Sequence, residues 1–282
     1  MKNIIGGEFT GERALFASSD LNIKGAHFHS GESPLKESRG LDLAGCEFSW
    51  KYPLWYCKDV NVIDTVFNEG ARSGIWYTDN ISMTRCVIDA PKMFRRSGSI
   101  RLEDVRFSNA QETMWNCSDV ELLGVHIKGD YFGFCSTDIY AENLDVDGNY
   151  IFDGAKNVTV KNSRLISKDA FWNCEDVLVE NCEIVGEYLG WNSKNIAFIN
   201  CTIESNQGMC YMDNVVMRGC KLINTDLCFE YCSVDAEIDS HIDSVKNPTS
   251  GRIVAESIGE IIHEPDMVDV SATTITEVKS DV

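Results

Sequence analysis

The chain has 282 residues, 44% hydrophobic and 24% charged, which is enough for one large or two small domains with a real core. Its 25 basic and 44 acidic residues give a formal net charge of −19, which disfavours nucleic acid, anionic membranes and polyanionic substrates. No apolar run approaches the roughly 18 residues of a membrane span, and the N-terminus lacks a secretory pattern. We therefore expect a cytoplasmic protein with no membrane and no nucleic-acid partner.

A repeat of 19–21 residues organises most of the chain. Each repeat opens with the pattern apolar-x-apolar-x-x-small-x-apolar, and an earlier opening at Lys2 fits the same frame. The other openings are Leu21, Leu41, Val60, Ile81, Ile100, Val120, Ile139, Val158, Val177, Ile196, Val215 and Val234. Alternation of period two predicts strands, and so short a repeat has no room for a crossover helix.

These features predict an all-β fold, a single-stranded right-handed parallel β-helix of about 12–13 coils, with equivalent strands paired about 4.8 Å apart. The regular repeat ends after Val234. We therefore assign residues 1–233 to the β-helix repeats, and residues 234–282 to C-terminal capping strands and a polar tail of the same domain.

Most of the 12 cysteines occupy two columns of the repeat that also carry Ser, Ala and Thr. Interchange among these residue types indicates small side chains that face inward. We expect buried free thiols rather than disulfides, and the absence of any C-x-x-C motif argues against a cysteine zinc site.

A third strand near the end of each coil carries an outward column rich in aromatic residues. Its tryptophans define an aromatic stripe: Trp55, Trp76, Trp115, Trp172 and Trp191. Arg95 and Asp153 share that column, and the column beside it contains Tyr56, Tyr77 and Arg96. Aromatic rings interleaved with polar groups are typical of sugar recognition. The same rings would also stabilise a β ladder without any ligand, and both interpretations stay open.

Charged residues near the N-terminal end of the stripe form the best candidate for chemistry. We predict Glu37 as an acid or base, with Lys36 and Arg39 holding a carboxylate or a developing enolate. Arg95 and Arg96 follow three coils later. A salt-bridge group with no catalytic role is the alternative. Asp153 is a lone acid between aromatic neighbours in its column, which favours a raised pKa, but no second carboxylate shares the column.

No metal or other cofactor is predicted. His27 and His29 resemble a metal-binding pair on one strand face, but the sequence shows no third ligand. Residues 224–226, Asn-Thr-Asp, match one short polygalacturonase-like string, although the partner motifs of that enzyme are missing.

Several longer strings resemble a bacterial family of unknown function in the pectin-lyase-like superfamily. They are SPLKESR (33–39), YPLW (52–55), GEYLGW (186–191), FEY (229–231) and HIDSVKNP (241–248). The resemblance implies a right-handed parallel β-helix over nearly the whole chain. By analogy with the superfamily it also implies polysaccharide lyase, hydrolase or isomerase activity, although fold alone does not fix function.

Two functional hypotheses follow. The first is a protein that binds or acts on a neutral or amino-sugar oligosaccharide along the stripe. The second is a non-catalytic scaffold that forms a homodimer, or binds another protein, through the stripe or the edge of the N-terminal coil.

Overall fold

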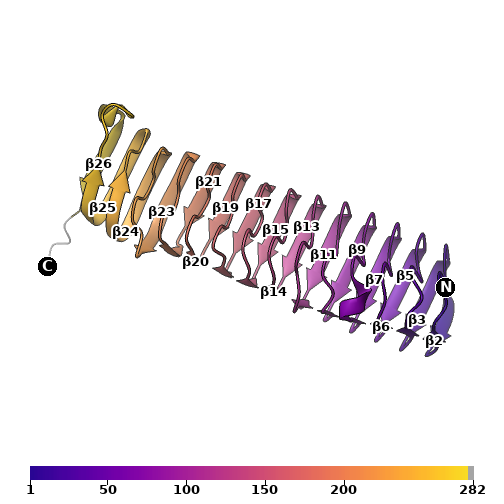
Figure 1. Cartoon of the computed structure of the whole chain (residues 1–282). Coiled ribbons are helices and arrows are strands. Elements are labelled where there is room, and N and C mark those ends of the chain that lie inside the picture. The colour runs from indigo at the N-terminus through magenta and orange to yellow at the C-terminus, as the bar shows by residue number, and fades with distance from the viewer. Residues whose placement is uncertain (279–282) are drawn as a thin grey trace. The chain divides into compact units, whose positions relative to one another are not determined.

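The computed structural model describes residues 1–278 and divides the chain into two compact units, Met1–Asp145 and Val146–Val282. Each unit is a stack of short parallel strands wound in successive coils, which confirms the predicted right-handed parallel β-helix (Figure 1). The described residues make about fifteen turns, more than the twelve to thirteen expected. Among residues 1–278, no helix has the length and apolarity needed to cross a membrane.

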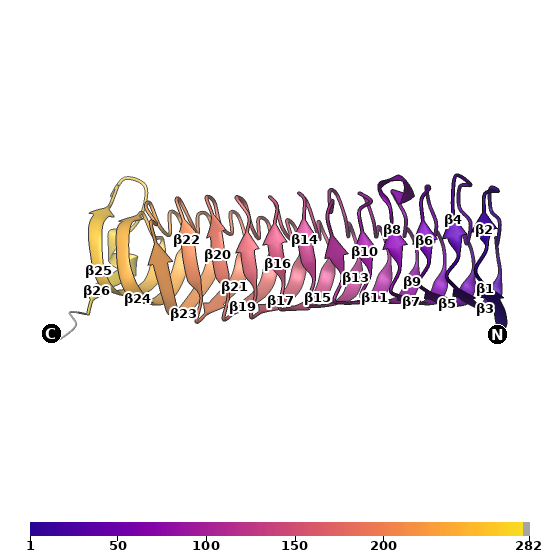
Figure 2. The same ribbon diagram turned by 90° about the horizontal axis from the view of Figure 1, so that it is seen from below.

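In the N-terminal unit, long and short strands alternate along the chain. The long strands are β1 (Lys2–Ile5), β3 (Ser19–Lys24), β5 (Arg39–Ala44), β7 (Lys58–Ile63), β9 (Asp79–Thr84), β11 (Gly98–Glu103), β13 (Ser118–Leu123) and β15 (Thr137–Glu142). The short strands are β2 (Glu8–Phe9), β4 (His27–Phe28), β6 (Glu47–Phe48), β8 (Val66–Phe67), β10 (Val87–Ile88), β12 (Arg106–Phe107) and β14 (His126–Lys128). A 3-10 turn, η1, covers Glu69–Ala71. Figure 2 shows β2, β4, β6 and β8 side by side.

In the C-terminal unit the same alternation gives way to longer strands. Strand β16 (Asp145–Asp147) begins at the last residue of the N-terminal unit. The strands that follow are β17 (Lys156–Lys161), β18 (Arg164–Ile166), β19 (Glu175–Glu180), β20 (Glu183–Gly186), β21 (Lys194–Ile199), β22 (Thr202–Ser205), β23 (Asp213–Ile223), β24 (Ser233–Lys246), β25 (Ser250–Ile262) and β26 (Thr273–Glu277). A second 3-10 turn, η2, covers Val270–Ala272.

The strand register follows the repeat found in the sequence. Lys2 pairs with Leu21, Leu21 with Leu41, and Val177 with Ile196, so equivalent openings of neighbouring coils lie opposite one another. Residues after Val234 continue the parallel ladder, with β24 paired to β25 and β25 to β26. These three strands lie in the segment predicted to cap the fold, and they account for the additional turns.

The inward columns form the core of each unit. Phe28, Phe48 and Phe67 stack with ring centroids 4.6 and 4.9 Å apart and are at most 2% exposed. The equal spacing of parallel coils brings identical side chains into register, so flat rings fill this column without gaps.

The segment expected to be a third strand forms only isolated bridges, such as Trp76 to Arg95 and Arg95 to Trp115. Its backbone alternates into the left-handed region, with φ of +61° at Met114 and +53° at Asn116. Such residues bend the chain out of the extended conformation, so a continuous ladder cannot form. The outward aromatic side chains therefore project from a run of turns.

The cysteines are free, and all are buried except Cys135, which confirms the predicted buried thiols. One column of Ser, Thr and Cys side chains joins successive coils. Ser136 Oγ accepts a hydrogen bond from the Cys117 backbone N–H at 2.9 Å and donates one to the Met114 carbonyl at 2.7 Å. The column therefore satisfies buried backbone groups at a corner that has no strand ladder.

Candidate functional site

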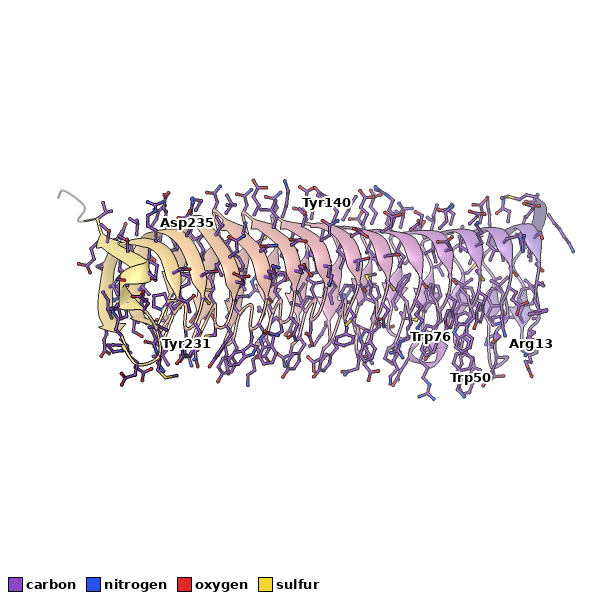
Figure 3. The ribbon with its side chains drawn as sticks, turned by 90° about the horizontal axis from the view of Figure 1, so that it is seen from above. Arg13, Trp50, Trp76, Tyr140, Tyr231 and Asp235 are labelled. Carbon is purple, nitrogen blue, oxygen red and sulfur yellow. The ribbon has the colours of Figure 1, made fainter. Side chains whose placement is uncertain are left out.

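In the N-terminal unit, the aromatic stripe is a stacked ladder. The rings of Trp55 and Trp76 are 5.2 Å apart and nearly parallel. The Arg95 guanidinium lies 4.7 Å from the Trp76 ring centroid and 4.5 Å from that of Trp115. Both faces of Trp76 are thus covered by neighbours from its own unit. Figure 3 shows Trp76, Trp50 and Arg13 on one side of this unit and Tyr140 on the opposite side.

The indole N–H groups of the ladder are also engaged within the protein. Trp76 Nε1 donates to the Lys92 carbonyl at 2.9 Å, and Trp115 Nε1 donates to the Tyr131 carbonyl at 2.8 Å. In both cases the acceptor lies 16 residues further along the chain, on the next coil. Trp55 and Trp172 make the same kind of bond. The stacking covers the ring faces and these bonds occupy the N–H groups. Together they favour the ladder interpretation, because a sugar would need an open ring face.

The charged cluster predicted as catalytic is only partly assembled. Lys36 Nζ lies 3.7 Å from Glu37 Oε1 and 5.5 Å from the centre of the Tyr56 ring, and the Glu37 side chain is 50% exposed. Arg39 begins β5, in register between Ser19 and Lys58. Lys36 and Glu37 therefore form a surface ion pair, a common arrangement that by itself gives no sign of a reactive acid.

The remaining cations of the cluster have separate roles. Arg95 belongs to the ladder and pairs with Glu112 at 3.4 Å. Tyr77 stacks on Tyr56 with ring centroids 4.7 Å apart. Tyr77 and Arg96 line a surface hollow of about 390 Å³ together with Asn116. The structure thus brings Tyr77 and Arg96 to one place, and Glu37 is not among the residues that line this hollow.

The strongest constellation lies in the C-terminal unit, where the ladder is interrupted. Gly154 N donates to the Trp172 carbonyl and Asn173 N donates to the Trp191 carbonyl, so Asp153, Trp172 and Trp191 hold equivalent places in successive coils. Where the following coils carry an indole, this coil carries Asp153, and the Asp153 side chain is half-buried. Its Oδ1 accepts a hydrogen bond from Asn173 Nδ2 at 2.8 Å. Burial raises the pKa of Asp153, and the Asn173 bond offsets part of that shift.

A second carboxyl group lies near Asp153. Asp169 is 2% exposed, and burial raises its pKa, with the negative charges of Glu187 and Asp153 acting in the same direction. The positive charge of Lys168 and a hydrogen bond with Tyr150 oppose the shift. Asp169 is therefore a second carboxyl group close enough for the charge of Asp153 to affect it, and the sequence interpretation did not find it.

A spacing rule identifies Asp169 in retrospect. Three stripe tryptophans bond the carbonyl of the residue 16 positions later, as Trp76 does with Lys92 and Trp172 with Tyr188, whereas Trp55 bonds the residue 18 positions later. Asp169 stands 16 positions after Asp153. The sequence analysis compared residues only within single columns, and this diagonal relation between neighbouring coils was missed.

Aromatic rings complete the constellation. Tyr150 meets Trp172 edge to face, with ring centroids 5.5 Å apart and an interplanar angle of 90°. Trp172 and Trp191 are 5.8 Å apart, and Trp191 continues to Tyr211 at 4.7 Å. We call Tyr150, Asp153, Asp169, Trp172 and Asn173 the Asp153 site. It offers acceptors, an amide donor and aromatic surface within one unit.

A family model described as "Protein of unknown function (DUF3737)" matches residues 2–276. The chain belongs to the DUF3737 family. This match confirms the family resemblance seen in the sequence strings. No curated protein matches the chain.

Solved structures with a similar fold share little sequence with this protein. A surface adhesin of Streptococcus pneumoniae, PfbA, has 9% identity and a TM-score of 0.40, with 98% of this chain and 84% of that chain covered. The A-module of the Azotobacter vinelandii mannuronan C-5 epimerase AlgE4 has 9% identity and a TM-score of 0.34, with 99% and 87% covered. Likenesses this weak carry no argument about what the DUF3737 chain does.

Proposed function

We propose that this DUF3737 protein binds a neutral or amino-sugar glycan at the Asp153 site. The observation that carries the proposal is the interruption of the aromatic ladder. Asp153 places a half-buried carboxyl group where the following coils place an indole, next to the ring of Trp172. Its short side chain leaves aromatic surface and hydrogen-bonding groups together, whereas the ring faces of Trp76 are covered.

The chemistry of the site matches that of a sugar. A pyranose ring presents C–H groups to an aromatic ring, while its hydroxyls need directional donors and acceptors. Asp153 and Asn173 supply these polar partners, and Trp172 and Tyr150 supply the rings. The net charge of −19 and the two carboxyl groups disfavour uronic acids and favour neutral or positively charged sugars.

The same geometry indicates which reaction to look for. Glycoside hydrolysis commonly uses two carboxyl groups, one of which donates a proton to the leaving oxygen. In the proposed role Asp153 donates that proton, because a raised pKa keeps more of its carboxyl protonated. Asp169 is almost fully buried, and the negative charge of Asp153 raises the pKa of Asp169, so Asp169 does not touch the sugar. In this role water attacks the anomeric carbon as the glycosidic bond breaks, and the proton of that water passes to solvent.

Tryptophan fluorescence tests the binding proposal directly. The purified protein is titrated with neutral, amino and uronic-acid oligosaccharides, since Trp172 within the site serves as a reporter. We expect a saturable change with one class of neutral or amino sugar. Asp153→Asn, nearly equal in size, should weaken binding at least about tenfold, the effect of losing about 1.4 kcal/mol.

Asp176→Asn is the matched control. Asp176 is exposed and accepts a hydrogen bond from Asn195 Nδ2 at 2.8 Å, as Asp153 does from Asn173, but no ring contact surrounds it in the described contacts. This variant should bind like the wild type. Emission that no sugar alters, or equal binding by Asp153→Asn and the wild type, would refute the proposal.

A scaffold is the second candidate, and the covered rings of the ladder favour it. Rings that stack on one another and bond their own backbone stabilise a protein without any ligand. Under this proposal the protein forms a homodimer or binds another protein along its aromatic stripe. Light scattering tests the dimer, and a strictly monomeric mass at high protein concentration would count against it.

A further inference from the structure

His27 on strand β4 and His29 just after it lie beside Glu8 of the preceding coil. Glu8 on β2 lies in register with His27 on β4, and His29 follows two residues later on the same outward face. Nitrogen and oxygen atoms of the three side chains all lie within 4.8 Å of one another. The sequence interpretation found no third ligand, because Glu8 is distant from the pair along the chain.

The contacts within this group are specific. Glu8 uses both carboxylate oxygens: Oε1 lies 3.5 Å from His27 Nδ1, and Oε2 is hydrogen-bonded to His29 Nε2. Two imidazole nitrogens thus converge on one carboxylate.

The backbone beneath the group is held firmly. His27 N donates to the Gly7 carbonyl at 2.9 Å and His29 N donates to the Phe9 carbonyl at 2.8 Å. On the inward side, Phe9 stacks on Phe28 with centroids 4.8 Å apart. Because strands and rings fix the positions of the Cα atoms, only side-chain rotations are needed to adjust the three ligand atoms.

We propose that Glu8, His27 and His29 bind one Zn²⁺ ion. Two imidazoles and a carboxylate are a donor set that suits zinc, whereas Ca²⁺ and Mg²⁺ prefer oxygen ligands alone. Tetrahedral zinc holds its ligand atoms about 3.3 Å apart, so the widest spacing has to contract by about 1.5 Å at most, and the hydrogen-bonded atoms of Glu8 and His29 have to move apart. The side chains are 43–63% exposed and free to make that adjustment.

The surroundings also favour a cation. Glu47 on β6 lies in register with His27 on the side away from Glu8, and its Oε1 accepts a hydrogen bond from Asn68 Nδ2 at 2.6 Å. It is thus held as a nearby negative charge rather than as a ligand. Three protein ligands leave the fourth zinc position to water or to an incoming donor atom, which is the arrangement of open rather than structural zinc sites.

Titration with Co²⁺, a coloured substitute for zinc, tests the site and identifies its ligands. We expect one equivalent to bind, with visible absorption bands but without the near-ultraviolet bands that thiolate ligands produce. Zn²⁺ should displace it, and competition against a chromophoric chelator then gives the zinc affinity. Glu8→Gln, His27→Gln and His29→Gln should each weaken zinc at least about 100-fold, the upper end of what losing an outer hydrogen-bond partner costs.

His126→Gln is the matched control. His126 is also exposed on a short strand of the same unit and lies 3.4 Å from a single carboxylate, that of Asp145. This variant should bind zinc like the wild type. All four substitutions lie on the surface, and circular dichroism verifies that each variant is folded. No binding, thiolate bands, or undiminished affinity in the three ligand variants would overturn the proposal.

Discussion

Ser136 provides the sharpest test of how the coils are joined at their turn-rich corner. It is fully buried, and its hydroxyl bridges two backbone groups of the preceding coil, the Cys117 N–H and the Met114 carbonyl. Ser136→Ala removes the bridge while changing the volume very little. Cys117 and Met114 are both buried, so water cannot replace the lost partner of either backbone group.

The expected cost follows from counting these two groups. Leaving a buried donor or acceptor without a partner costs about 1–3 kcal/mol each, so Ser136→Ala should lower the free energy of unfolding by about 2–6 kcal/mol. Ser136→Cys should cost less, about 1 kcal/mol, because a thiol retains weaker forms of both bonds. Cysteines at equivalent places do this already: Cys57 Sγ donates to the Leu35 carbonyl at 3.1 Å.

Urea and thermal unfolding followed by circular dichroism measure the difference. At about 2–4 °C for each kcal/mol, we expect Ser136→Ala to lower Tm by about 5–20 °C. Ser108→Ala, which removes an exposed hydroxyl bonded to Asp89, should stay within about 0.5 kcal/mol of the wild type. If Ser136→Ala were as stable as Ser108→Ala, the hydroxyl column would not join the coils as argued.

Three further predictions concern the ladder, the Asp153 site and the thiols. Trp76→Phe keeps the stacked ring but loses the bond to the Lys92 carbonyl, so urea unfolding should show a loss of about 1 kcal/mol; no loss would mean that the bond contributes nothing. Because burial raises the pKa of Asp153 in the folded state, its ionisation destabilises the fold. The stability gained by Asp153→Asn over the wild type should therefore grow as the pH rises above the ordinary aspartate pKa and level off above the raised one, whereas a pH-independent difference would contradict the shift. A thiol reagent should rapidly modify only Cys135 in the native protein, since the other cysteines are buried and burial raises the pKa of Cys57 and Cys117 to about 12; a fast reaction that survives in Cys135→Ser would contradict this.

The fold was predictable because its information is local and repeated. The openings at Leu21, Leu41 and Val60 show the period, and in a parallel β-helix the period alone sets the register. The end of the regular repeat was harder to interpret. Val234 pairs with Gly251, and Gly251 with Thr273, so the coil length changes while the ladder continues. A search at fixed spacing cannot detect coils of altered length.

The candidate sites were less predictable because they depend on relations between coils other than direct register. Asp169 approaches Asp153 along the diagonal that the indole bonds follow, and Glu8 meets two side chains of the next coil at once. Rotamers decide such contacts, and the sequence columns carry no information about them. Lys36 and Glu37 were visible in the sequence as either a reactive group or a salt bridge, and the structure shows the ion pair.

The two sites proposed here have a common physical origin. Where a column repeats the same residue type, neighbours satisfy one another: phenylalanines stack and indoles bond the next carbonyl. Arg95 interrupts the tryptophan column, but the two rings beside it enclose its guanidinium group. Such columns leave little capacity for a ligand. A residue that breaks its column leaves groups that the ladder does not satisfy in the regular way, as Asp153 does among tryptophans and His27 does between two glutamates. In a β-helix, interruptions of the columns are therefore places to look for function, whereas a stripe ring such as Trp76 is already engaged by its neighbours on both faces and at its N–H group.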